Sequence, residues 1–411
     1  MKKHERIKII SDQIRIKGQV SLFDLSQQFN VTIRTIRNDL KELQTKIGCE
    51  IFRGGAKKKK INYGSLYTSV YNKNFNLKIN NNYLSTQNDT KSQILNSSQS
   101  NTDDYKKIFI LGSFNIDICV EVDDFASIGE TLAAESINYY SGGKGTNQAT
   151  AASCISDKVH LTVKIGSDAL SFKAQEFIKN IPLMSRTVLM DNEYSTGQAV
   201  IVSAKKAGNN KVYANLGANL HITLNEIEQD LCHLDQSDIL LTQLENNFDV
   251  TKHLIQRAHN QNILVVLDPS PLNLNCIPLL QQVDIILPNQ VEASKLSNIE
   301  ILNYESAKEA AYKIHGMGPK HVIIKMSKDG CVYFNGEKFW IFPTYKSYVV
   351  DTCGAGDAFA GAFVGELSRG KTIKESIKFA NSYASLKIER KGASNMPKRE
   401  LAISRLLEKT N

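Results

Sequence analysis

The stretch VVDTCGAGDAFAGAF, residues 349–363, decides how the rest of this chain is interpreted. A short β-branched run ends at Asp351, and Gly354–Gly356 then leads directly into a helical pattern. Four successive backbone N–H groups at the start of a helix form a site for an anion. Asp357, in the first turn, is the carboxylate beside that site. From these residues alone, Asp357 either takes a proton from an alcohol that attacks phosphorus or only stabilises the helix dipole.

A second glycine-rich stretch, YYSGGKGTNQATAA at 139–152, has three glycines within four positions. Glycine is costly to order, so we expect the backbone to turn sharply there or to approach a ligand closely. The stretch lacks the spacing of a P-loop, which occurs instead in GELSRGKT at 365–372. Residues 357–368, however, predict a helix where a P-loop needs a strand. Gly370 then indicates the end of that helix and Thr372 the cap of the next, so this match predicts only a cap and a turn.

From residue 107 onward, apolar β-branched runs alternate with helical patterns. This alternation predicts a mostly parallel sheet with helices on both faces, and ligands then bind at the carboxyl ends of the strands. The expected strands are KIFILGSFNIDICVEV (107–122), VHLTVKIG (159–166), DILLTQLE (238–245), ILVVLDPS (263–270), VDIILPN (283–289) and HVIIKMS (321–327). Their ends carry Asn115, Asp117, Gly166, Glu245, Asp268, Asn289 and Ser327.

The length and composition of the chain restrict the class of protein. The 411 residues are enough for two or three domains, and a hydrophobic content of 42% provides a full core. The longest apolar runs, such as ILVVL at 263–267, are far shorter than a membrane span, and charges interrupt the N-terminal segment, so no secretory leader is expected. The seven cysteines include no Cys-x-x-Cys pair and no metal-ligand spacing, which predicts a cytoplasmic protein.

The net charge of +8 is unevenly distributed along the chain. Residues 1–60 carry 15 Lys and Arg against 6 Asp and Glu, a net charge of +9, whereas the rest carries 35 against 36, a net charge of −1. Such asymmetry indicates a nucleic-acid-binding module attached to a nearly neutral body.

Three short amphipathic helices are predicted within the basic segment. Their apolar faces carry Ile7, Ile10 and Ile14, then Leu22, Leu25 and Phe29, then Ile36, Leu40, Leu43 and Ile47. Ser21 and Thr32 are the expected caps of the second and third helices, and EIFRGGA, 50–56, adds a strand and a turn. This is the layout of a winged helix-turn-helix. The outward positions of the third helix, whose side chains suit bases and phosphates, are Arg34, Thr35, Arg37, Asn38 and Lys41.

Residues 57–106 differ in composition from both flanks. Four lysines open the segment, Asn and Ser then dominate, and the scattered apolar residues have no sustained period. We therefore expect a mobile linker whose lysines add modest non-specific contacts to DNA. The expected domains are 1–56, a winged helix-turn-helix; 57–106, a linker; and 107–411, an α/β domain.

Two families resemble parts of this chain. Residues 5–56, with SLFDLSQQFNVTIRTIRNDLKEL and the wing FRGGA, resemble the DNA-binding domain of DeoR-type sugar repressors. Residues 107–400 resemble the ribokinase family of PfkB-type carbohydrate kinases in LGSFNID, GGKGTNQA, STGQAV, NLGAN, QLE, LDPSP, PNQVEA and DTCGAGDAFAGAF, which stand in the family's order. The resemblance implies a ribokinase-like three-layer α/β/α sandwich with a small β-lid, preceded by a small winged helix-turn-helix domain.

The kinase resemblance implies a role for each motif. The sugar-binding residues would be Asn115, Asp117, Gly142, Gly143, Lys144, Asn147, Glu245 and Asp357. Asp357 would also be the general base for the 5-hydroxyl, and the amides of 354–357 would neutralise the transferring phosphoryl group. ATP would be bound by Asn289, Lys325, Ser327, Gly354, Ala355, Gly356 and Asn381.

The same resemblance implies ATP, Mg²⁺ and K⁺ as cofactors. Asn289 and Glu292 would hold magnesium through waters. The contacts of an activating potassium ion would be Asp351, Cys353, Lys387, Arg390 and Gly392. Residues 118–140, with VYANLGAN at 212–219, would form a lid that closes over the sugar, excludes water and pairs two subunits in a homodimer.

Three positions depart from the family's pattern. Ser327 stands where glycine is common, so its side chain either crowds ATP or adds a hydroxyl contact. The segment 393–397 is one residue short, which concerns the last carbonyl of the potassium site. Lys387 replaces a small residue, and only its carbonyl is required by the resemblance.

Two classes of function follow. In the first, the chain phosphorylates D-ribose at O5 with ATP, giving ribose 5-phosphate and ADP, and a sugar-responsive domain binds double-stranded DNA. In the second, the kinase-like domain only senses sugar for a transcription regulator. Asp357 and the Asn289/Glu292 pair favour activity, because sensing requires the sugar contacts alone. Deoxyribose, another pentose or a nucleoside is the alternative substrate, and no membrane partner is expected.

Overall fold

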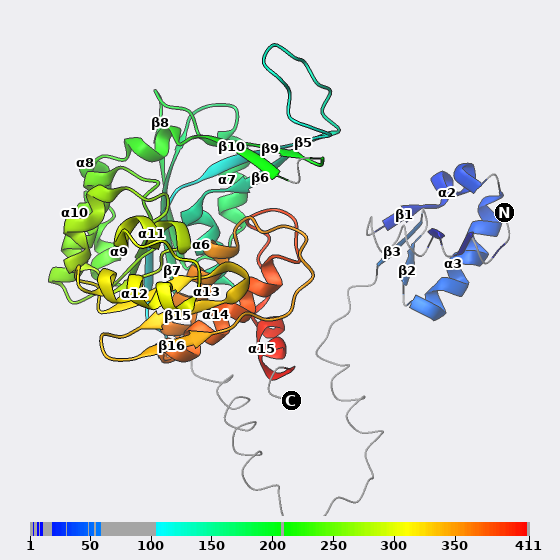
Figure 1. Cartoon of the computed structure of the whole chain (residues 1–411). Coiled ribbons are helices and arrows are strands. Elements are labelled where there is room, and N and C mark those ends of the chain that lie inside the picture. The colour runs from blue at the N-terminus through cyan, green and yellow to red at the C-terminus, as the bar shows by residue number, and fades with distance from the viewer. Residues whose placement is uncertain are drawn as a thin grey trace, which may run out of the picture. The chain divides into compact units, whose positions relative to one another are not determined.

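The computed structural model describes residues 3, 6–7, 9–10, 19–29, 31–47, 49–52, 55–58, 104–206 and 209–408. The chain forms two compact units, Met1–Leu95 and Asn96–Asn411 (Figure 1). Most of the predicted linker, residues 59–103, lies outside the described residues.

The N-terminal unit combines helices with a small antiparallel sheet. Residues 6–7 and 9–10 are helical, and the other elements are β1 (Gln19–Ser21), α2 (Leu22–Phe29), α3 (Ile33–Ile47), β2 (Cys49–Phe52) and β3 (Gly55–Lys58). The strand order is β1–β3–β2. The core consists of Ile7, Ile10, Leu22, Leu25, Ile36 and Leu40, with Phe29 and Val31 packed against it. The predicted apolar faces are confirmed at these positions; the side chains of Ile14, Leu43 and Ile47 lie outside the described ones.

Both predicted caps of this unit are confirmed. The Asp24 N–H donates to Ser21 Oγ at 3.4 Å, and the Thr35 N–H donates to Thr32 Oγ1 at 3.2 Å. Such bonds satisfy backbone donors that the first turn of a helix leaves without a partner. The two short helices therefore begin where the sequence places them.

The C-terminal unit is built on a nine-stranded sheet with the order β16–β15–β14–β13–β12–β11–β4–β7–β8. Its strands are β4 (Ile108–Leu111), β7 (Val159–Gly166), β8 (Ser185–Asp191), β11 (Ile239–Thr242), β12 (Leu264–Leu267), β13 (Ile285–Ile286), β14 (His321–Lys325), β15 (Cys331–Phe334) and β16 (Phe339–Phe342). Pairing is parallel from β14 to β8 and antiparallel at β14–β15–β16. The predicted mostly parallel sheet is confirmed.

Helices cover both faces of this sheet. The α-helices are α6 (Lys144–Ser153), α7 (Ser171–Asn180), α8 (Leu224–Glu228), α9 (Leu231–Asp235), α10 (Phe248–Asn260), α11 (Gln290–Ser297), α12 (Tyr304–His315), α13 (Ala355–Ser368), α14 (Ile373–Lys387) and α15 (Arg399–Glu408). Short 3₁₀ helices are η3 (Gly217–His221), η4 (Leu274–Gln282) and η5 (Ser327–Asp329). No helix in the described ranges is both long and apolar enough to cross a membrane.

The nine-stranded sheet lies between two hydrophobic cores, and strand β4 contributes residues to both. Its residues Ile108 and Ile110 pack with α6, α13 and α14, whereas Phe109 and Leu111 pack with α10, α11 and α12. Alternate residues of a strand point to opposite faces, so this division follows the pleat. The unit is the α/β/α sandwich that the sequence predicts (Figure 1).

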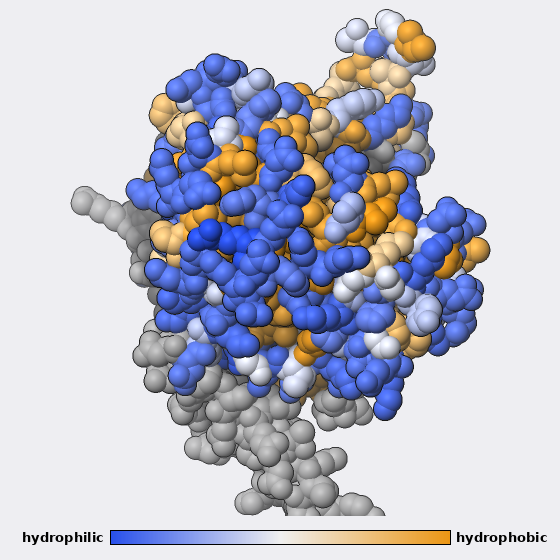
Figure 2. Space-filling model, turned by 90° about the vertical axis from the view of Figure 1, so that its left-hand side faces the viewer, coloured by the Kyte–Doolittle hydropathy of each residue, from blue (hydrophilic) through white to orange (hydrophobic). Residues whose placement is uncertain are grey.

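A separate four-stranded sheet has the order β10–β9–β5–β6 and forms the lid. Its strands are β5 (Asn115–Val122), β6 (Ser136–Gly142), β9 (Gly197–Ala204) and β10 (Asn209–Asn215). The loop between β5 and β6 projects from the unit (Figure 1), and Figure 2 shows hydrophobic as well as polar atoms at its tip. The predicted strand 107–122 is therefore two strands in two sheets. They separate at Gly112, where an added Cβ would lie 2.6 Å from the Cα of Gly145.

The P-loop-like match at 365–372 is a cap and a turn, as predicted. Helix α13 ends at Ser368, Gly370 has a φ of +76°, and Thr372 caps α14 through the Glu375 N–H. Among the described residues nothing lies within 4 Å of a Cβ built at Gly370. The glycine is therefore explained by its positive φ alone.

Candidate active site

The predicted anion site lies at the N-terminus of α13. Gly354 is its N-cap with a φ of +76°, and an added Cβ would lie 3.0 Å from the Cα of Ala393. The Ala355 N–H donates to the Thr352 carbonyl at 3.2 Å, which closes a turn. Within the described residues, the N–H groups of Gly354, Gly356 and Asp357 have no backbone acceptor. The site therefore offers three free donors, and the predicted four is wrong because the turn uses one.

The Asp357 carboxylate is held by two amides beside this site. Asp357 is buried, its Oδ2 accepts from Asn147 Nδ2 at 2.9 Å, and its Oδ1 accepts from Gln148 Nε2 at 3.2 Å. Asn147 is oriented in turn by Ser394 Oγ, which donates to its Oδ1 at 2.7 Å. A carboxylate with both oxygens fixed next to free N–H donors is arranged to accept a proton from a neighbouring alcohol.

A hydrogen-bond network connects Asp357 to a second carboxylate, Asp268. Gln148 Nε2 also donates to Asp268 Oδ2 at 2.8 Å, and Lys325 Nζ donates to Asp268 Oδ1 at 3.0 Å. Gln243 Nε2 fixes the amide of Gln148 by donating to its Oε1 at 2.7 Å. The sequence motifs contain Gln148 and Gln243, but their polarity alone gave no reason to choose them.

Several of the predicted sugar-binding residues lie at the end of the lid sheet where β5 begins and β6 stops. Asn115 pairs with Gly142 across β5 and β6, and its Oδ1 accepts from Asn219 Nδ2 at 3.1 Å. Asn219 also bonds the N–H and the carbonyl of Phe114, both at 2.9 Å, so it fixes the start of β5. Gly143, the N-cap of α6, has a φ of +93°.

Glu245 joins this end of the lid sheet to the start of α6. Its Oε2 accepts from the Lys144 N–H at 3.1 Å and from Ser113 Oγ. The structure therefore brings together Asn115, Asp117, Gly142, Gly143, Lys144 and Glu245, which the sequence places in three separate motifs. Asn147 differs, because its side-chain amide contacts Asp357 and Ser394.

Burial raises the pKa of the acids Asp117 and Glu245, whereas neighbouring carboxylates raise that of Lys144. The pKa of Asp117 is raised to about 7, first by burial and then by Glu245, Asp357 and Asp351. Burial also raises the pKa of Glu245, against the nearby ammonium of Lys144. Desolvation of the half-buried Lys144 lowers its pKa, but the carboxylates Asp357, Asp268, Glu245 and Glu292 together outweigh this effect and raise it. Lys144 is therefore a fixed cation among carboxylates.

A cavity of about 690 Å³ opens onto the anion site. This volume is typical of a small-molecule site. Its lining includes every predicted nucleotide-binding residue, namely Asn289, Lys325, Ser327, Gly354, Ala355, Gly356 and Asn381, together with Lys144 and Asp357. Lys144 and Asp357 therefore lie where the cavity meets the predicted sugar residues. The other predicted sugar residues do not line it.

The predicted magnesium residues cap α11. Asn289 Oδ1 accepts from the Glu292 N–H at 2.9 Å, and Glu292 Oε2 accepts from the Asn289 N–H at 2.8 Å. This reciprocal capping uses Asn289 Oδ1 and Glu292 Oε2, and both residues line the cavity. The pair fits a hydrated magnesium ion, which retains several waters and takes one or two carboxylates.

Two further cavity residues have specific backbone roles. Ser327 has a φ of +54°, in the left-handed region that favours glycine, which accounts for the glycine common at this position. Asn381 Nδ2 donates to the carbonyl of Phe342 at 3.0 Å and thereby holds the chain that leaves β16.

The five residues predicted to hold potassium lie close together. The ammonium group of one of them, Lys387, contacts another member of the set. Asp351 Oδ1 accepts from the Cys353 N–H at 2.9 Å, and Asp351 Oδ2 accepts from the Gly392 N–H at 2.8 Å. Lys387 is fully buried, and its ammonium donates to the Arg390 carbonyl at 3.3 Å. One predicted ligand of the ion thus already binds a cation, so these residues do not fit potassium.

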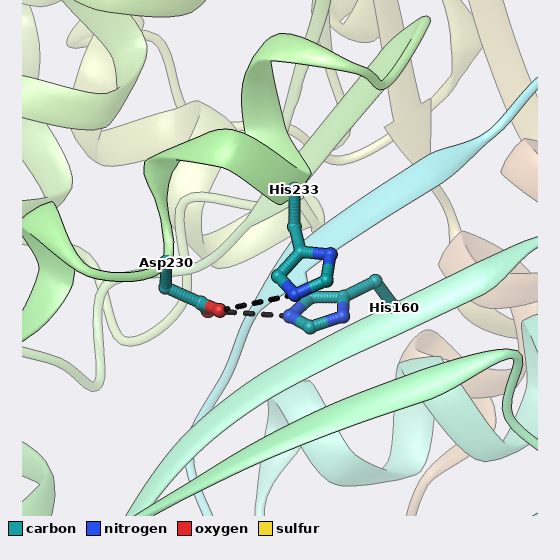
Figure 3. A group of neighbouring side chains, drawn as sticks. All are labelled: His160, Asp230 and His233. Carbon is teal, nitrogen blue, oxygen red and sulfur yellow. Dashed lines mark hydrogen bonds and ion pairs between the residues drawn. The ribbon is translucent and has the colours of Figure 1, made fainter.

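A second cluster of polar side chains lies on β7 and α9 (Figure 3). His160, Asp230 and His233 are the group of possible metal ligands found in the described parts of the chain. Asp230, however, also accepts hydrogen bonds from the hydroxyls of Thr162 and Thr187. The two imidazole rings are stacked, with centroids 4.1 Å apart and planes 16° apart. An imidazole binds a metal in its own plane, so nearly parallel stacked rings do not converge on one ion.

The N-terminal unit presents the predicted DNA-binding residues on one side of α3. Four of them are exposed, namely Arg34, Arg37, Asn38 and Lys41, and Thr35 is half-buried. Asp39 instead points inward, where its buried carboxylate accepts from Arg6 Nε at 2.6 Å. The helix therefore separates a buried ion pair and apolar stripe from a basic, exposed face.

Both units match known families. Residues 105–399 match the pfkB family carbohydrate kinase, and residues 6–61 match the DeoR-like helix-turn-helix domain. The ribokinase of Haemophilus influenzae is 33% identical over 296 residues, which cover 72% of this chain and 96% of that protein. A deoxyribokinase of Salmonella typhi is 26% identical over 291 residues, 70% of this chain and 94% of that protein.

Solved structures agree with the sequence comparisons. The ribokinase of Thermotoga maritima is 34% identical with a TM-score of 0.67, and the match covers 74% of this chain and 100% of that one. The ribokinase of Arabidopsis thaliana, solved with ribose and ATP, is 29% identical with a TM-score of 0.67, over 74% of this chain and 99% of that one.

Proposed function

Because this chain belongs to the pfkB family of carbohydrate kinases and carries a DeoR-like helix-turn-helix domain, we propose that it phosphorylates D-ribose at O5 with ATP and binds double-stranded DNA. The proposed kinase activity rests on one observation: Asn147 and Gln148 hold the Asp357 carboxylate beside three free backbone N–H donors. A protein that only senses a sugar does not require that arrangement.

In the proposed reaction, Asp357 accepts the proton of the 5-hydroxyl while the sugar oxygen forms a bond to the γ-phosphorus. The bond from that phosphorus to the bridging oxygen then breaks, and ADP leaves with the electron pair. The free amides of Gly354, Gly356 and Asp357 neutralise charge on the transferring group, and Lys144 adds a fixed cation at the junction with the sugar.

Magnesium, held through waters by Asn289 and Glu292, would neutralise the phosphates of ATP. Ribose would be held by Asn115, Asp117 and Glu245, with the glycines of 142–143 allowing close approach of the backbone. Potassium is left out of the proposal, because the ammonium of Lys387 lies among the residues that would bind it.

Ribose is favoured over deoxyribose by the ribokinases among the relatives, one of them solved with ribose and ATP. Deoxyribose is the second candidate, since a deoxyribokinase is also a relative. Initial rates with ATP and a panel of pentoses and nucleosides distinguish the two. We expect the highest kcat/KM for ribose, and a higher value for deoxyribose would replace ribose as the substrate.

A homodimer through the lid is also proposed. Strand register places Ile118 between Tyr139 and Val200, and Val200 beside Tyr213, so these four side chains form one row across the sheet. Tyr139 and Tyr213 are more than half exposed. Exposed aromatic rows of this kind are typical of protein interfaces. Sedimentation of the full-length protein should show a dimer that Tyr213→Lys dissociates; a monomeric wild type would contradict it.

Ribose binding is expected to strengthen as the pH rises. The pKa of Asp117 is about 7, so its side chain is mostly a neutral acid below that pH and a carboxylate acceptor above it. The KM for ribose should therefore fall between about pH 6 and about pH 8 in the wild type. Asp117→Asn cannot ionise and should give a KM that is higher and independent of pH. A wild-type KM that does not change over this range would exclude Asp117 as the titrating acceptor.

Binding to DNA is expected to weaken steeply with salt. Each phosphate contact contributes a slope of about −0.9 to log K against log salt. Arg37→Ala should weaken specific binding by about 1–3 kcal/mol if Arg37 contacts a base, because its side chain is exposed on α3. Lys338→Ala removes the same charge from an exposed site in the C-terminal unit and serves as the control. Footprinting of the protein on its own promoter region checks this, and no protected site would contradict it.

A further inference from the structure

Lys387 is an unusual residue for the interior of a protein. It stands at the end of α14 with its side chain fully buried. Lysine is almost never buried to this degree unless its charge is paired, because an unpaired charge in the interior is very costly. Lys387 donates to the Arg390 carbonyl at 3.3 Å, and burial lowers the pKa of its ammonium, an effect that the charge of Asp351 opposes most among the surrounding groups.

The partners of Lys387 belong to two loops that support the anion site. The first is the turn from Asp351 to Gly354, and the second is 390–393. They are joined by the Gly392 N–H, which donates to Asp351 Oδ2 at 2.8 Å. They also touch directly, since a Cβ added at Gly354 would lie 3.0 Å from the Cα of Ala393. A change in either loop would therefore move the amides of Gly354 and Gly356.

We propose that the ammonium of Lys387 acts as a built-in monovalent cation, which neutralises Asp351, holds the Arg390 carbonyl and so positions the anion site without potassium. This inference rests on the proposed kinase function. Lys387 touches neither substrate in this arrangement, so it is a positioning residue. The Lys387 side chain thus supplies the positive charge that a bound potassium ion would otherwise provide.

A bound potassium ion and this ammonium exclude each other. Both would have to share the Arg390 carbonyl, and two like charges at one buried oxygen repel strongly. Both oxygens of Asp351 already accept backbone N–H groups, and the Gly392 carbonyl accepts the Asn395 N–H at 3.2 Å. Burial lowers the pKa of Lys387, and the charge of Asp351 opposes this shift without outweighing it.

The test uses the purified full-length protein, with tetramethylammonium as the monovalent cation and with potassium added in increasing amounts. The wild type should show the same kcat and the same melting temperature with and without potassium. Lys387→Ala leaves a space beside the Arg390 carbonyl, so it should lose at least about ten-fold in kcat without potassium and recover it when potassium is added. Its melting temperature should then rise with potassium, because an ion that binds only the folded state stabilises it.

Two further variants separate charge from volume. Lys387→Met fills the space without a charge, so potassium should not rescue its kcat. Lys378→Ala, on the exposed side of the same helix, removes a lysine without changing the site and should behave as the wild type.

Activation of the wild type by potassium, or a rise in its melting temperature with potassium, would overturn the inference. So would a Lys387→Ala variant that is fully active without potassium. A wild type with no kinase activity on any sugar would instead refute the proposed function, and the melting curves would still decide whether Lys387 replaces the ion.

Discussion

Replacing Asp357 with asparagine is expected to leave ribose binding in place and to lower kcat by about 10²–10⁴-fold, the usual contribution of a general base. An amide cannot accept the proton of the 5-hydroxyl. It also presents an NH₂ group towards Asn147 Nδ2 or Gln148 Nε2, both of which donate to the native carboxylate. The expected result is therefore a loss in turnover that exceeds any loss in affinity. Initial rates and calorimetric titration of ribose measure the two effects separately.

The matched control for this change is Asp249→Asn. Asp249 is also a first-turn carboxylate, at the start of α10, and it is exposed. If first-turn acids act only through the helix dipole, both variants should lose about 0.3–1 kcal/mol of stability and keep their turnover. A near-native kcat in Asp357→Asn would support the helix-dipole interpretation and would exclude Asp357 as the general base.

Gly143→Ala should raise the KM for ribose much more than the KM for ATP. Gly143 has a φ of +93°, and a Cβ would lie 2.6 Å from the Ser113 carbonyl, 2.7 Å from the Phe114 Cα and 2.8 Å from the Asn115 nitrogen. All three atoms belong to the backbone, so relief requires the start of β5 to move, and Asn115 with it. A displacement of about 1 Å in a binding group can cost about 10²-fold.

Gly370→Ala is the control for backbone strain. Gly370 has a similar φ of +76°, but a Cβ there meets no described atom within 4 Å. Both variants should therefore lose stability, which thermal melting measures, and only Gly143→Ala should lose ribose affinity. A selective rise in the KM for ATP would place the glycine-rich loop at the nucleotide instead of the sugar.

Local patterns predict much of this molecule. The alternation of strands and helices, the caps at Ser21, Thr32 and Thr372, and the outward basic face of α3 depend on neighbouring residues, and the structure has them where the sequence places them. Gly143 and Gly354 could be assigned to a close approach, because each has a positive φ and a crowded backbone that leave few other residues possible.

Contacts between distant residues could not be predicted. Gln148 reaches both Asp357 and Asp268, and Ser394 orients Asn147 from 247 residues away. Nothing in a neutral amide or hydroxyl indicates such partners. The direction of the Lys387 side chain was also unpredictable, because a carbonyl role and an ammonium role both fit a lysine at the end of a helix. The boundary between β4 and β5 depends on the approach of Gly112 to Gly145, which is a tertiary contact.

The central claim is that this chain transfers a phosphoryl group to ribose, and ³¹P NMR of the products tests it most directly. Purified full-length protein with ATP, Mg²⁺ and ribose should yield ADP and a phosphomonoester on C5 of ribose, and Asp357→Asn should form it at the reduced rate given above. If ribose binds with ordinary affinity while the spectrum shows no sugar phosphate from ribose or any other pentose, the chain is a sugar sensor and the proposed kinase function is wrong.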